Sequence, residues 1–420
     1  MKPRVETISV IGLGYVGLPT AAVFASRGFN VVGVDVNERT VGLINRGDVH
    51  IVEPDLDILV RGAVAAGRLR ASTRTLAADA FIVAVPTPFT DGHKPDLSYL
   101  KDATTALAPV IKRGDLVVIE STSPVGTTEQ VSRWLAERRP DIAFPHAAGE
   151  DADVQVAHSP ERVLPGRVLL ELVSNDRVVG GVSRRCAERA AELYRLVVSG
   201  KCLTTTARTA ELVKLAENAF RDVNIAFANE LALVCERLGI DVWEAIQLAN
   251  RHPRVDILKP GPGVGGHCIA VDPWFIIDAL PDSTPLMRTA RTVNDSKPGQ
   301  VVALVRRAAE QRKAAGIACL GLAYKADIDD LRESPAVEIV RELARDPGLG
   351  NGTQVFAVEP HIQTLPEALR NLPRLRLVSL DEALAKAEVV VLLADHRTFK
   401  AVDRNRLKDK TVIDTRGVWR

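Results

Sequence analysis

The sequence predicts an α/β protein built from two doubly wound domains joined by a long central helix. Three observations indicate this fold. A glycine-rich turn separates a strand-like run from a helical run near the N-terminus, residues 209–238 keep a helical period without proline or glycine, and strand-like apolar runs return after residue 315. Alternating strands and helices are typical of parallel sheets covered on both faces. We expect an N-terminal domain at 1–206, a central helical region at 207–295 and a C-terminal domain at 296–420.

Length, charge and hydropathy narrow the class of protein. The chain has 420 residues, with 54 basic and 53 acidic side chains and a net charge of +1. This length suits two or three domains, and the balanced charge argues against a nucleic-acid or membrane-surface partner. No apolar run approaches the roughly 20 residues that span a bilayer, and no signal-peptide pattern opens the chain. We therefore expect a cytoplasmic protein.

The cysteines are widely spaced and odd in number, at positions 186, 202, 235, 268 and 319. No pair has the spacing of a zinc site, and no histidine cluster supplies further ligands. The pattern favours a reduced compartment and predicts no metal.

The first motif is Gly12-Leu-Gly-Tyr-Val-Gly17, which follows the β-rich run Thr7–Ile11 and precedes a helical stretch at 18–27. In this Rossmann-like setting Gly12 makes the tight turn, Gly14 lets a pyrophosphate approach the backbone, and Gly17 permits close helix packing. The N-terminus of the helix favours phosphate charge. A glycine turn without a ligand is the simpler alternative.

An acidic residue closes the second predicted strand, because Asn30-Val-Val-Gly-Val is followed by Asp35. A carboxylate at this place accepts hydrogen bonds from a ribose 2′-hydroxyl and repels a 2′-phosphate. The sequence therefore predicts NAD rather than NADP.

Polar loops follow two further apolar runs, at 80–85 and 116–120. The carboxyl ends of parallel strands carry the ligand in open α/β sheets. Thr87, Thr122 and Thr128 are thus candidates to contact cofactor or substrate, although each fits a helix N-cap equally well. Glu161 lies between prolines after another strand-like piece, and a solvated surface glutamate is the alternative there.

The helix predicted at 209–238 is about 45 Å long, which is long for one small domain, so we expect it to bridge domains or to form a subunit contact. A second helix follows at 242–250. Lys214, Asn218 and Arg221 share one face of the long helix. Together they offer donors toward an anionic or hydroxyl-rich ligand, whereas a solvated polar stripe is the alternative.

The stretch Gly261–Phe275 surrounds Cys268 with glycines and prolines, and Asp272 follows four residues later. Glycine lets a ligand approach the backbone closely and proline stiffens the loop. We interpret the stretch as a loop that presents a thiol to a small molecule. A lone cysteine is more often a small buried apolar residue.

The last third predicts a second, smaller doubly wound sheet. Pro298 is expected to open a helix to about residue 313, and strands are expected from 316, at 353–358, at 389–393 and at 411–413. The glycine fingerprint is missing here, so a second nucleotide is plausible, but not a second NAD in the usual pose. Lys325 and Arg332 suit a pyrophosphate of another nucleotide, and a purely structural domain is the alternative.

Together these motifs resemble the UDP-glucose/GDP-mannose dehydrogenase family, and the resemblance covers essentially the whole chain. It rests on Gly12–Gly17, Ser121-Thr-Ser-Pro-Val-Gly126, Pro160-Glu-Arg-Val163, Lys214-x-x-x-Asn218, Gly263-Val-Gly-Gly-His-Cys268 with Asp272, and Gly321-Leu-Ala-Tyr-Lys325. Within the family the chain is similar to the UDP-N-acetyl-D-mannosamine branch at 51–55, 160–166, 251–255 and 265–274. The glucose enzymes typically carry a lysine where this chain has Val271.

The resemblance implies an NAD-dependent, four-electron oxidation of the sugar C6, through a thiohemiacetal and then a thioester on Cys268. It implies that Glu161 aids release by water, and that Lys214 and Asn218 stabilise the oxyanion. Lys214 would also share in moving the first proton, and Asp272 with Thr122 would order the water and lysine network. The implied NAD contacts are Tyr15, Val16, Asp35, Thr87 and Thr128. The implied UDP-sugar contacts are Arg162, Val163, Lys214, Asn218, Arg221, Gly265, Tyr324, Lys325 and Arg332, with Arg416 where close relatives carry lysine.

His252 and Arg254 match family residues that reach the sugar nucleotide from a neighbouring subunit, which implies a homodimer or larger homo-oligomer with a shared active site. A uronic acid product suggests surface polysaccharide biosynthesis. Two alternatives stay open. The same chemistry on UDP-N-acetylglucosamine or UDP-glucose is one, and a catalytically silent nucleotide-binding protein is the other.

Overall fold

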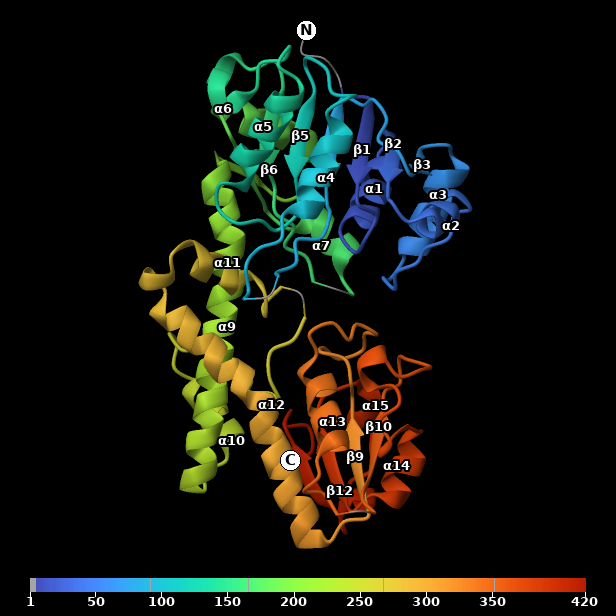
Figure 1. Ribbon diagram of the computed structural model, residues 1–420, viewed down its shortest axis with the longest axis vertical. Coiled ribbons are helices and arrows are strands. Elements are labelled where there is room, and N and C mark those ends of the chain that lie inside the picture. Colours follow the sequence, from blue (N-terminus) through green and yellow to red (C-terminus); the bar gives the residue numbers. More distant parts are fainter. Residues whose placement is uncertain (1–4, 91, 165, 267, 351) are drawn as a thin grey trace. The chain divides into compact units, whose positions relative to one another are not determined.

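The computed structural model describes residues 5–90, 92–164, 166–266, 268–350 and 352–420 (Figure 1). Pro165 and His267, which belong to two of the sequence motifs, lie outside the described residues. The chain forms two compact units by its internal contacts. The first unit comprises Met1–Glu217 and Trp274–Ala279, and the second comprises Asn218–Pro273 and Leu280–Arg420.

The first unit is built on one sheet of eight strands in the order β3-β2-β1-β4-β5-β6-β7-β8. All neighbouring strands are parallel except β6 and β7. Its elements are β1 (Thr7–Ile11), α1 (Gly17–Ser26), β2 (Asn30–Val34), α2 (Glu38–Asn45), α3 (Leu56–Ala65), β3 (Leu69–Ser72), β4 (Ala80–Val83), α4 (Ser98–Leu107), β5 (Leu116–Ile119), α5 (Thr127–Arg138), α6 (Pro145–Ala148), β6 (Gln155–His158), α7 (Val168–Ser174), β7 (Arg177–Gly181), α8 (Arg184–Tyr194) and β8 (Cys202–Thr206).

Both faces of this sheet are covered, because successive side chains of its central strands enter different hydrophobic clusters. On β4, Ala80 and Ile82 pack with residues of α1, α3, α7 and α8. Phe81 and Val83 pack with residues of α4 and α5 on the opposite face. Alternation between two buried faces explains why these strands are continuous apolar runs. The polar loops at their carboxyl ends are therefore the places left for a ligand.

The second unit contains a five-stranded parallel sheet in the order β11-β10-β9-β12-β13. Helices α12 and α13 cover one face, and α14 and α15 cover the other. The elements after the first sheet are α9 (Ala207–Leu238), α10 (Val242–Ala249), α11 (Asp272–Ala279), α12 (Pro285–Arg312), β9 (Gly316–Leu320), α13 (Pro335–Arg345), β10 (Gln354–Val358), β11 (Leu375–Leu377), α14 (Leu380–Lys386), β12 (Val389–Leu392), α15 (Arg397–Lys400) and β13 (Thr411–Asp414).

The predicted fold class is confirmed, and the long central helix is α9, with 32 residues. The division at 1–206, 207–295 and 296–420 stays a prediction.

The prediction that Pro298 opens a helix is wrong, because α12 begins at Pro285 and contains Pro298 in its interior. An interior proline removes one backbone hydrogen bond and disfavours a helix. Tertiary contacts outweigh that penalty here. Arg291 and Asn294 both bind the buried Oδ1 of Asp222 on α9, at 2.6 and 2.8 Å, and they hold the first half of α12 in place.

Candidate functional site

The glycine turn between β1 and α1 is shaped by close backbone approach. Gly12 has a φ of +91°, and a Cβ on it would lie 2.6 Å from the Ala84 carbonyl oxygen. A Cβ on Gly17 would lie 1.8 Å from the Gly12 carbonyl oxygen. Gly14 is exposed, and a Cβ there would meet no atom within 4 Å. The turn therefore leaves open backbone at Gly14, which suits the pyrophosphate of a dinucleotide.

Asp35 lies directly after β2 and is half-buried. Its Oδ2 accepts a hydrogen bond from the Leu13 amide at 3.0 Å, and its Oδ1 accepts one from the Asn37 amide at 2.9 Å. The carboxylate is thus tied to the glycine turn, at the place where a ribose hydroxyl is bound in dinucleotide folds. Tyr15 and Val16 lie half-buried in the turn just before α1.

The loops after β4 and β5 are joined by Thr87, whose hydroxyl donates to the Thr122 carbonyl oxygen at 2.6 Å. Thr128 is fully buried on α5, and its hydroxyl donates to Glu211 Oε1 at 2.6 Å. Glu211 also accepts the amides of Gly126 and Thr128, at 2.6 and 2.7 Å. A carboxylate from α9 therefore occupies the N-terminus of α5, where an anion is favoured. Cofactor contacts at Thr87 and Thr128 stay predictions.

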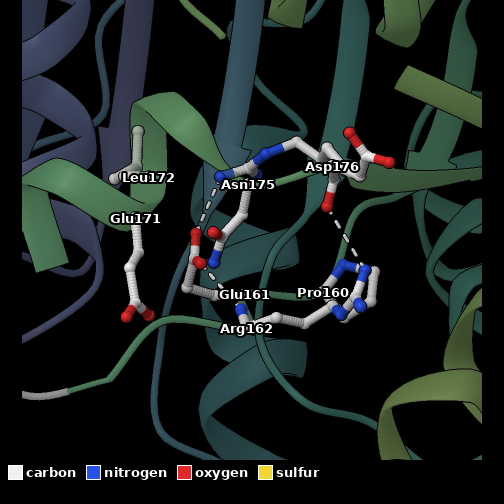
Figure 2. A pocket seen from close by; sticks show the side chains of 8 residues that line it. Pro160, Glu161, Arg162, Glu171, Leu172, Asn175 and Asp176 are labelled. Atoms are coloured by element: carbon white, nitrogen blue, oxygen red, sulfur yellow. Dashed lines mark hydrogen bonds and ion pairs between the residues drawn. The ribbon is translucent and has the colours of Figure 1, made fainter. Parts of the chain in front are cut away.

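Glu161 is buried in the loop after β6, and a small pocket lies beside it (Figure 2). Its Oε2 pairs with Arg177 Nη2 at 2.7 Å, and its Oε1 accepts the Arg162 amide at 2.7 Å. The solvated-glutamate alternative fails, because only 8 % of the residue is exposed. The pocket has a volume of about 10 Å³, which is about the space one water molecule requires.

Arg162, the next residue, binds Glu217 with two nitrogens, Nε at 3.0 Å and Nη2 at 2.8 Å. Val163 packs against the hydrophobic cluster of the first unit. Beyond them, Glu53 accepts the amides of Gly166 and Val168 at 2.8 and 2.7 Å. The loop after β6 is therefore fixed at both ends by carboxylates.

Lys214 and Asn218 lie one turn apart on α9, and both are buried. Asn218 Nδ2 donates to Asp272 Oδ2 at 2.5 Å. Within the described part of the chain, the Lys214 ammonium has no hydrogen-bond or ion-pair partner, whereas most buried lysines are paired. Arg221 is exposed, so the predicted shared face is buried at two of its three positions.

The cysteine loop packs against the segment that follows β9. A Cβ on Gly265 would lie 2.7 Å from the Tyr324 Cβ, and the Gly266 amide donates to the Arg332 carbonyl oxygen at 3.2 Å. The Cys268 carbonyl oxygen accepts the amide of Asp272, the first residue of α11, at 2.8 Å. Because these glycines carry no side chain, Gly265 can lie close to Tyr324 and Arg332. The hydrogen-bonded turn from Cys268 to Asp272 links the cysteine to the Asn218–Asp272 pair.

The other cysteines are poorer candidates for a reactive thiol. Cys186, Cys235 and Cys319 are buried, whereas Cys268 is half-buried. Burial raises the pKa of Cys319 to about 12, and burial also raises the pKa of Cys202. A thiol with a raised pKa carries little thiolate and is a weak nucleophile near neutral pH.

The remaining predicted substrate contacts lie at the surface of the second unit or near it. Arg332 pairs with Asp330 at 2.6 Å, and Arg416 pairs with Asp395 at 3.1 Å. Lys325 is half-buried. His252 and Arg254 are exposed after α10.

One group of side chains has the composition of a metal site. Ligand atoms of Asp327, His361 and His396 lie within 4.8 Å of one another. However, His396 Nδ1 accepts a hydrogen bond from the Asp327 amide at 2.8 Å, and its Nε2 is hydrogen-bonded to Glu359 Oε2 at 3.1 Å. Because both nitrogens of the imidazole have hydrogen-bond partners, we interpret the group as a structural contact that holds the loop after β9.

Sequence reasoning missed Glu211 and Arg177. Glu211 lies 83 positions from Thr128 and Arg177 lies 16 from Glu161, and neither spacing is a motif. The available signal was a single charged residue at the start of the apolar run 177–181.

His158, the last residue of β6, is fully buried, and neither ring nitrogen has a partner in the described residues. Burial lowers its pKa from 6.5 to about 3. Because the unfolded chain binds a proton that the folded chain excludes, stability is full above pH 6.5 and falls as the pH decreases toward 3. We expect wild type to lose about 2 kcal/mol of this contribution between pH 7 and pH 5.

The replacement His158→Leu should remove this part of the pH dependence. Urea midpoints at the two pH values measure it, and His361→Leu, at an exposed histidine, is the control. An unchanged difference between pH 7 and pH 5 in His158→Leu would contradict the assignment.

None of the described helices is long and apolar enough to cross a membrane. The fold and the glycine turn define an NAD-binding α/β oxidoreductase with a second nucleotide-type domain. The chain belongs to the UDP-glucose/GDP-mannose dehydrogenase family. It matches that family's NAD-binding domain at residues 6–198, its central domain at 208–296 and its UDP-binding domain at 318–420.

Three relatives illustrate the similarity. The chain is 60 % identical over 414 residues to a Ralstonia nicotianae protein named NDP-N-acetyl-D-galactosaminuronic acid dehydrogenase, covering 99 % of this chain and 96 % of that protein. It is 56 % identical over 422 residues to the UDP-N-acetyl-D-mannosamine dehydrogenase of Escherichia coli K12, covering 99 % of each. A solved UDP-D-ManNAc dehydrogenase from Pyrococcus horikoshii superposes with a TM-score of 0.87, at 41 % identity over 98 % of this chain and 96 % of that one.

Proposed function

We propose that this protein oxidises C6 of UDP-N-acetyl-D-mannosamine to the uronic acid with two NAD. The overall change converts one CH₂OH group, two NAD⁺ and one water into a carboxylate, two NADH and three protons. The observation that carries the proposal is the glycine-shaped loop, which holds a half-buried Cys268 one turn away from the buried Asn218–Asp272 pair. Such a loop suits covalent capture of an aldehyde by a thiol.

Each residue then has a distinct task. Gly12, Gly14, Gly17 and Asp35 would hold NAD, which would supply the acceptor for the hydride that leaves the sugar carbon in each of the two oxidations. Cys268 adds to the aldehyde as a thiolate, and this thiohemiacetal becomes a thioester in the second oxidation. Lys214 and Asn218 donate to the oxyanion, and the Lys214 ammonium, which has no partner among the described residues, is available for that role.

The last step is hydrolysis, in which Glu161 accepts a proton from the attacking water. In the earlier steps, Lys214 shares in moving the first proton, and Asp272 orders the water network with Thr122. We assign the substrate contacts to Arg162, Val163, Arg221, Gly265, Tyr324, Lys325, Arg332 and Arg416.

The sugar is assigned from two observations. Val271 occupies the place where the glucose enzymes typically carry lysine, and the Escherichia coli relative is named for UDP-N-acetyl-D-mannosamine. UDP-N-acetylgalactosamine is the second candidate, because the Ralstonia relative is named for the corresponding uronic acid.

The test is NADH formation by purified protein, with each of UDP-N-acetylmannosamine, UDP-N-acetylgalactosamine, UDP-N-acetylglucosamine and UDP-glucose. We expect two NADH per sugar with the mannosamine compound. Two NADH with another sugar alone would keep the chemistry and overturn the substrate. No NADH with any sugar, while NAD still binds, would favour a catalytically silent nucleotide-binding protein.

We further propose a homodimer in which α9 supplies the contact and His252 and Arg254 reach the partner's sugar nucleotide. Phe220, Phe227 and Val234 lie seven residues apart on α9 and are 68 %, 55 % and 45 % exposed. Exposed apolar side chains at this spacing form one stripe along a helix, which indicates a helix-packing partner. A second copy of the chain is the partner that fits a shared active site.

Replacing Phe227 with glutamate should disrupt this dimer, because a charge would be buried without a partner. We expect the dimer dissociation constant to rise by at least about 100-fold. Light scattering after size exclusion measures the mass of the particle against the 45.4 kDa chain. The control is Ile58→Glu on α3, where an isoleucine is 65 % exposed. A Phe227→Glu protein with the mass of wild type would contradict the proposal.

A further inference from the structure

A buried arginine, Arg177, is hydrogen-bonded to Glu161. Arg177 opens strand β7 and is 5 % exposed. Its Nη2 donates to Glu161 Oε2 at 2.7 Å, and its Nη1 donates to Glu120 Oε1 at 2.9 Å. One guanidinium therefore connects a carboxylate of the core to the carboxylate assigned to hydrolysis.

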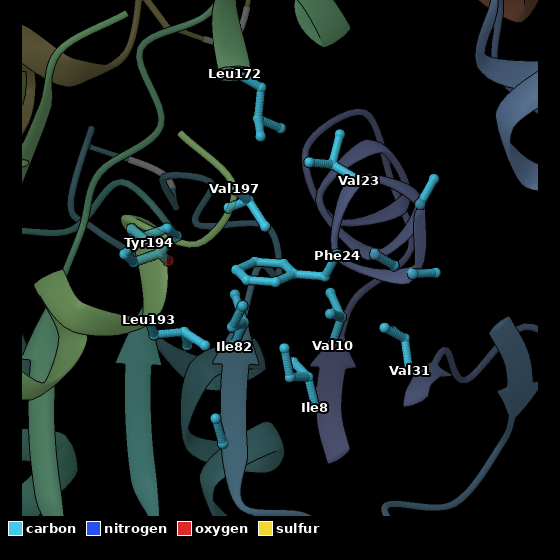
Figure 3. Packing of buried hydrophobic residues seen from close by; sticks show 14 of the residues in the cluster. Ile8, Val10, Val23, Phe24, Val31, Ile82, Leu172, Leu193, Tyr194 and Val197 are labelled. Atoms are coloured by element: carbon cyan, nitrogen blue, oxygen red, sulfur yellow. The ribbon is translucent and has the colours of Figure 1, made fainter. Parts of the chain in front are cut away.

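The other end of this network is anchored deep in the first unit. Glu120 accepts the Tyr194 hydroxyl at 2.7 Å and the Thr20 hydroxyl at 3.1 Å. The Arg177 guanidinium lies 4.3 Å from the centre of the Tyr194 ring. Figure 3 shows Tyr194 beside Phe24 in the hydrophobic cluster, with ring centroids 6.1 Å apart. The network therefore starts from packed side chains that have little freedom to move.

The carboxylates of Glu161 and Glu120 keep the Arg177 guanidinium charged. Burial alone would lower the pKa of Arg177, but the negative charges of Glu161 and Glu120 outweigh burial and raise it. Burial raises the pKa of Glu120, although Arg177 opposes this shift. The guanidinium lies between the Glu120 and Glu161 carboxylates and balances the negative charge of both, which is what two buried carboxylates require.

The geometry at Glu161 also fixes the direction of its remaining lone pairs. Arg177 holds Oε2 and the Arg162 amide holds Oε1, both at 2.7 Å. Only an ionised and oriented carboxylate can take a proton from water at a defined position. We propose that Arg177 is a positioning residue for thioester hydrolysis, because it holds the Glu161 carboxylate aimed at the attacking water. This inference rests on the proposed function.

The step itself balances without a further reactant. The water oxygen attacks the carbonyl carbon of the thioester, and a water proton passes to Glu161. The carbon–sulfur bond then breaks, and Cys268 leaves as a thiolate while the sugar leaves as a uronic acid. Arg177 exchanges no proton and serves only to hold the acceptor.

A purely structural ion pair is the competing explanation, because buried pairs are common in folds without a chemical role. The two explanations differ for Arg177→Lys. Lysine keeps a positive charge, but its compact ammonium lacks the planar fork that binds both carboxylates at once. Positioning predicts a defect confined to hydrolysis, whereas a structural role predicts loss of stability without a particular slow step.

The experiment mixes each variant with NAD and UDP-N-acetylmannosamine, quenches in acid and records the intact protein mass together with NADH formation. For Arg177→Lys we expect kcat to fall by about 10- to 100-fold and a covalent uronyl adduct on Cys268 to accumulate. Glu161→Gln should accumulate the same adduct. The matched control is Arg139→Lys in the first unit, where a guanidinium pairs with Asp141 at 2.7 Å and binds the Ile111 carbonyl oxygen. It should turn over like wild type without adduct.

An Arg177→Lys protein that is folded but accumulates no adduct, whatever its kcat, would overturn the inference. If Arg177→Lys does not fold, Glu120→Gln is the test variant in its place. That change removes only the negative charge of the Glu120 carboxylate, which binds the other side of Arg177. We then expect a smaller fall in kcat, about 3- to 10-fold, again with adduct, and no adduct would overturn the inference. If neither wild type nor Glu161→Gln forms NADH or adduct, the proposed function itself fails.

Discussion

Replacing Cys268 with serine should abolish formation of the uronic acid and leave ligand binding in place. Serine preserves the size of the side chain, but its hydroxyl is almost never ionised near neutral pH and is a poor nucleophile. We expect kcat for the complete oxidation, with two NADH per sugar, to fall by at least about 1000-fold. NADH absorbance at saturating NAD and UDP-sugar, together with the amount of uronic acid formed, measures the loss, and calorimetry measures the affinity for each ligand.

The control for this change is Cys202→Ser. Cys202 lies half-buried on β8, at the edge of the first sheet. Its replacement removes a thiol of similar exposure at a place where we assign no chemistry, so kcat should stay within about 2-fold of wild type. NADH formation at the wild-type rate by Cys268→Ser would refute the covalent mechanism. Loss of NAD binding in the same variant would show instead that the serine disturbs the fold.

The features that sequence reasoning predicted well depend on residues that are neighbours in the chain. The strands around Ile82 and Val118 are apolar on both faces, and the glycine turn at Gly12–Gly17 carries its own steric signal. The shaped loop before Cys268 was predicted for the same reason, since glycine and proline act on their own backbone.

The features that were missed depend on tertiary packing. Glu211 occupies the N-terminus of α5, and its role exists only because α9 begins beside that helix. Arg177 acts through two carboxylates from different strand ends. Pro298 shows the opposite error, because a local rule predicted a helix start that ion pairs and packing across α12 override. Long-range contacts of this kind leave no spacing in the sequence.

Replacing Gly17 with alanine should prevent NAD binding while the UDP-binding domain keeps its ligand. The new Cβ would lie 1.8 Å from the Gly12 carbonyl oxygen and 3.3 Å from the Ala84 Cβ. Because the first contact is with backbone, α1 must move away from β1, and the turn that faces the pyrophosphate opens with it. We expect the NAD dissociation constant to rise by at least about 100-fold and the first unit to lose about 2 kcal/mol of stability. Calorimetry with NAD and, separately, with UDP measures both affinities.

Two further alanine variants distinguish a clash within the protein from a clash with the bound pyrophosphate. At Gly14 a Cβ meets no protein atom within 4 Å, so Gly14→Ala should fold like wild type. It should nevertheless bind NAD more weakly than wild type does, because the pyrophosphate needs bare backbone. Gly299 on α12 is equally open, so Gly299→Ala should keep full NAD affinity. If Gly17→Ala binds NAD like wild type, close packing of α1 does not shape the site. If Gly14→Ala does so as well, the pyrophosphate lies elsewhere, and the assignment of the turn as the cofactor site fails.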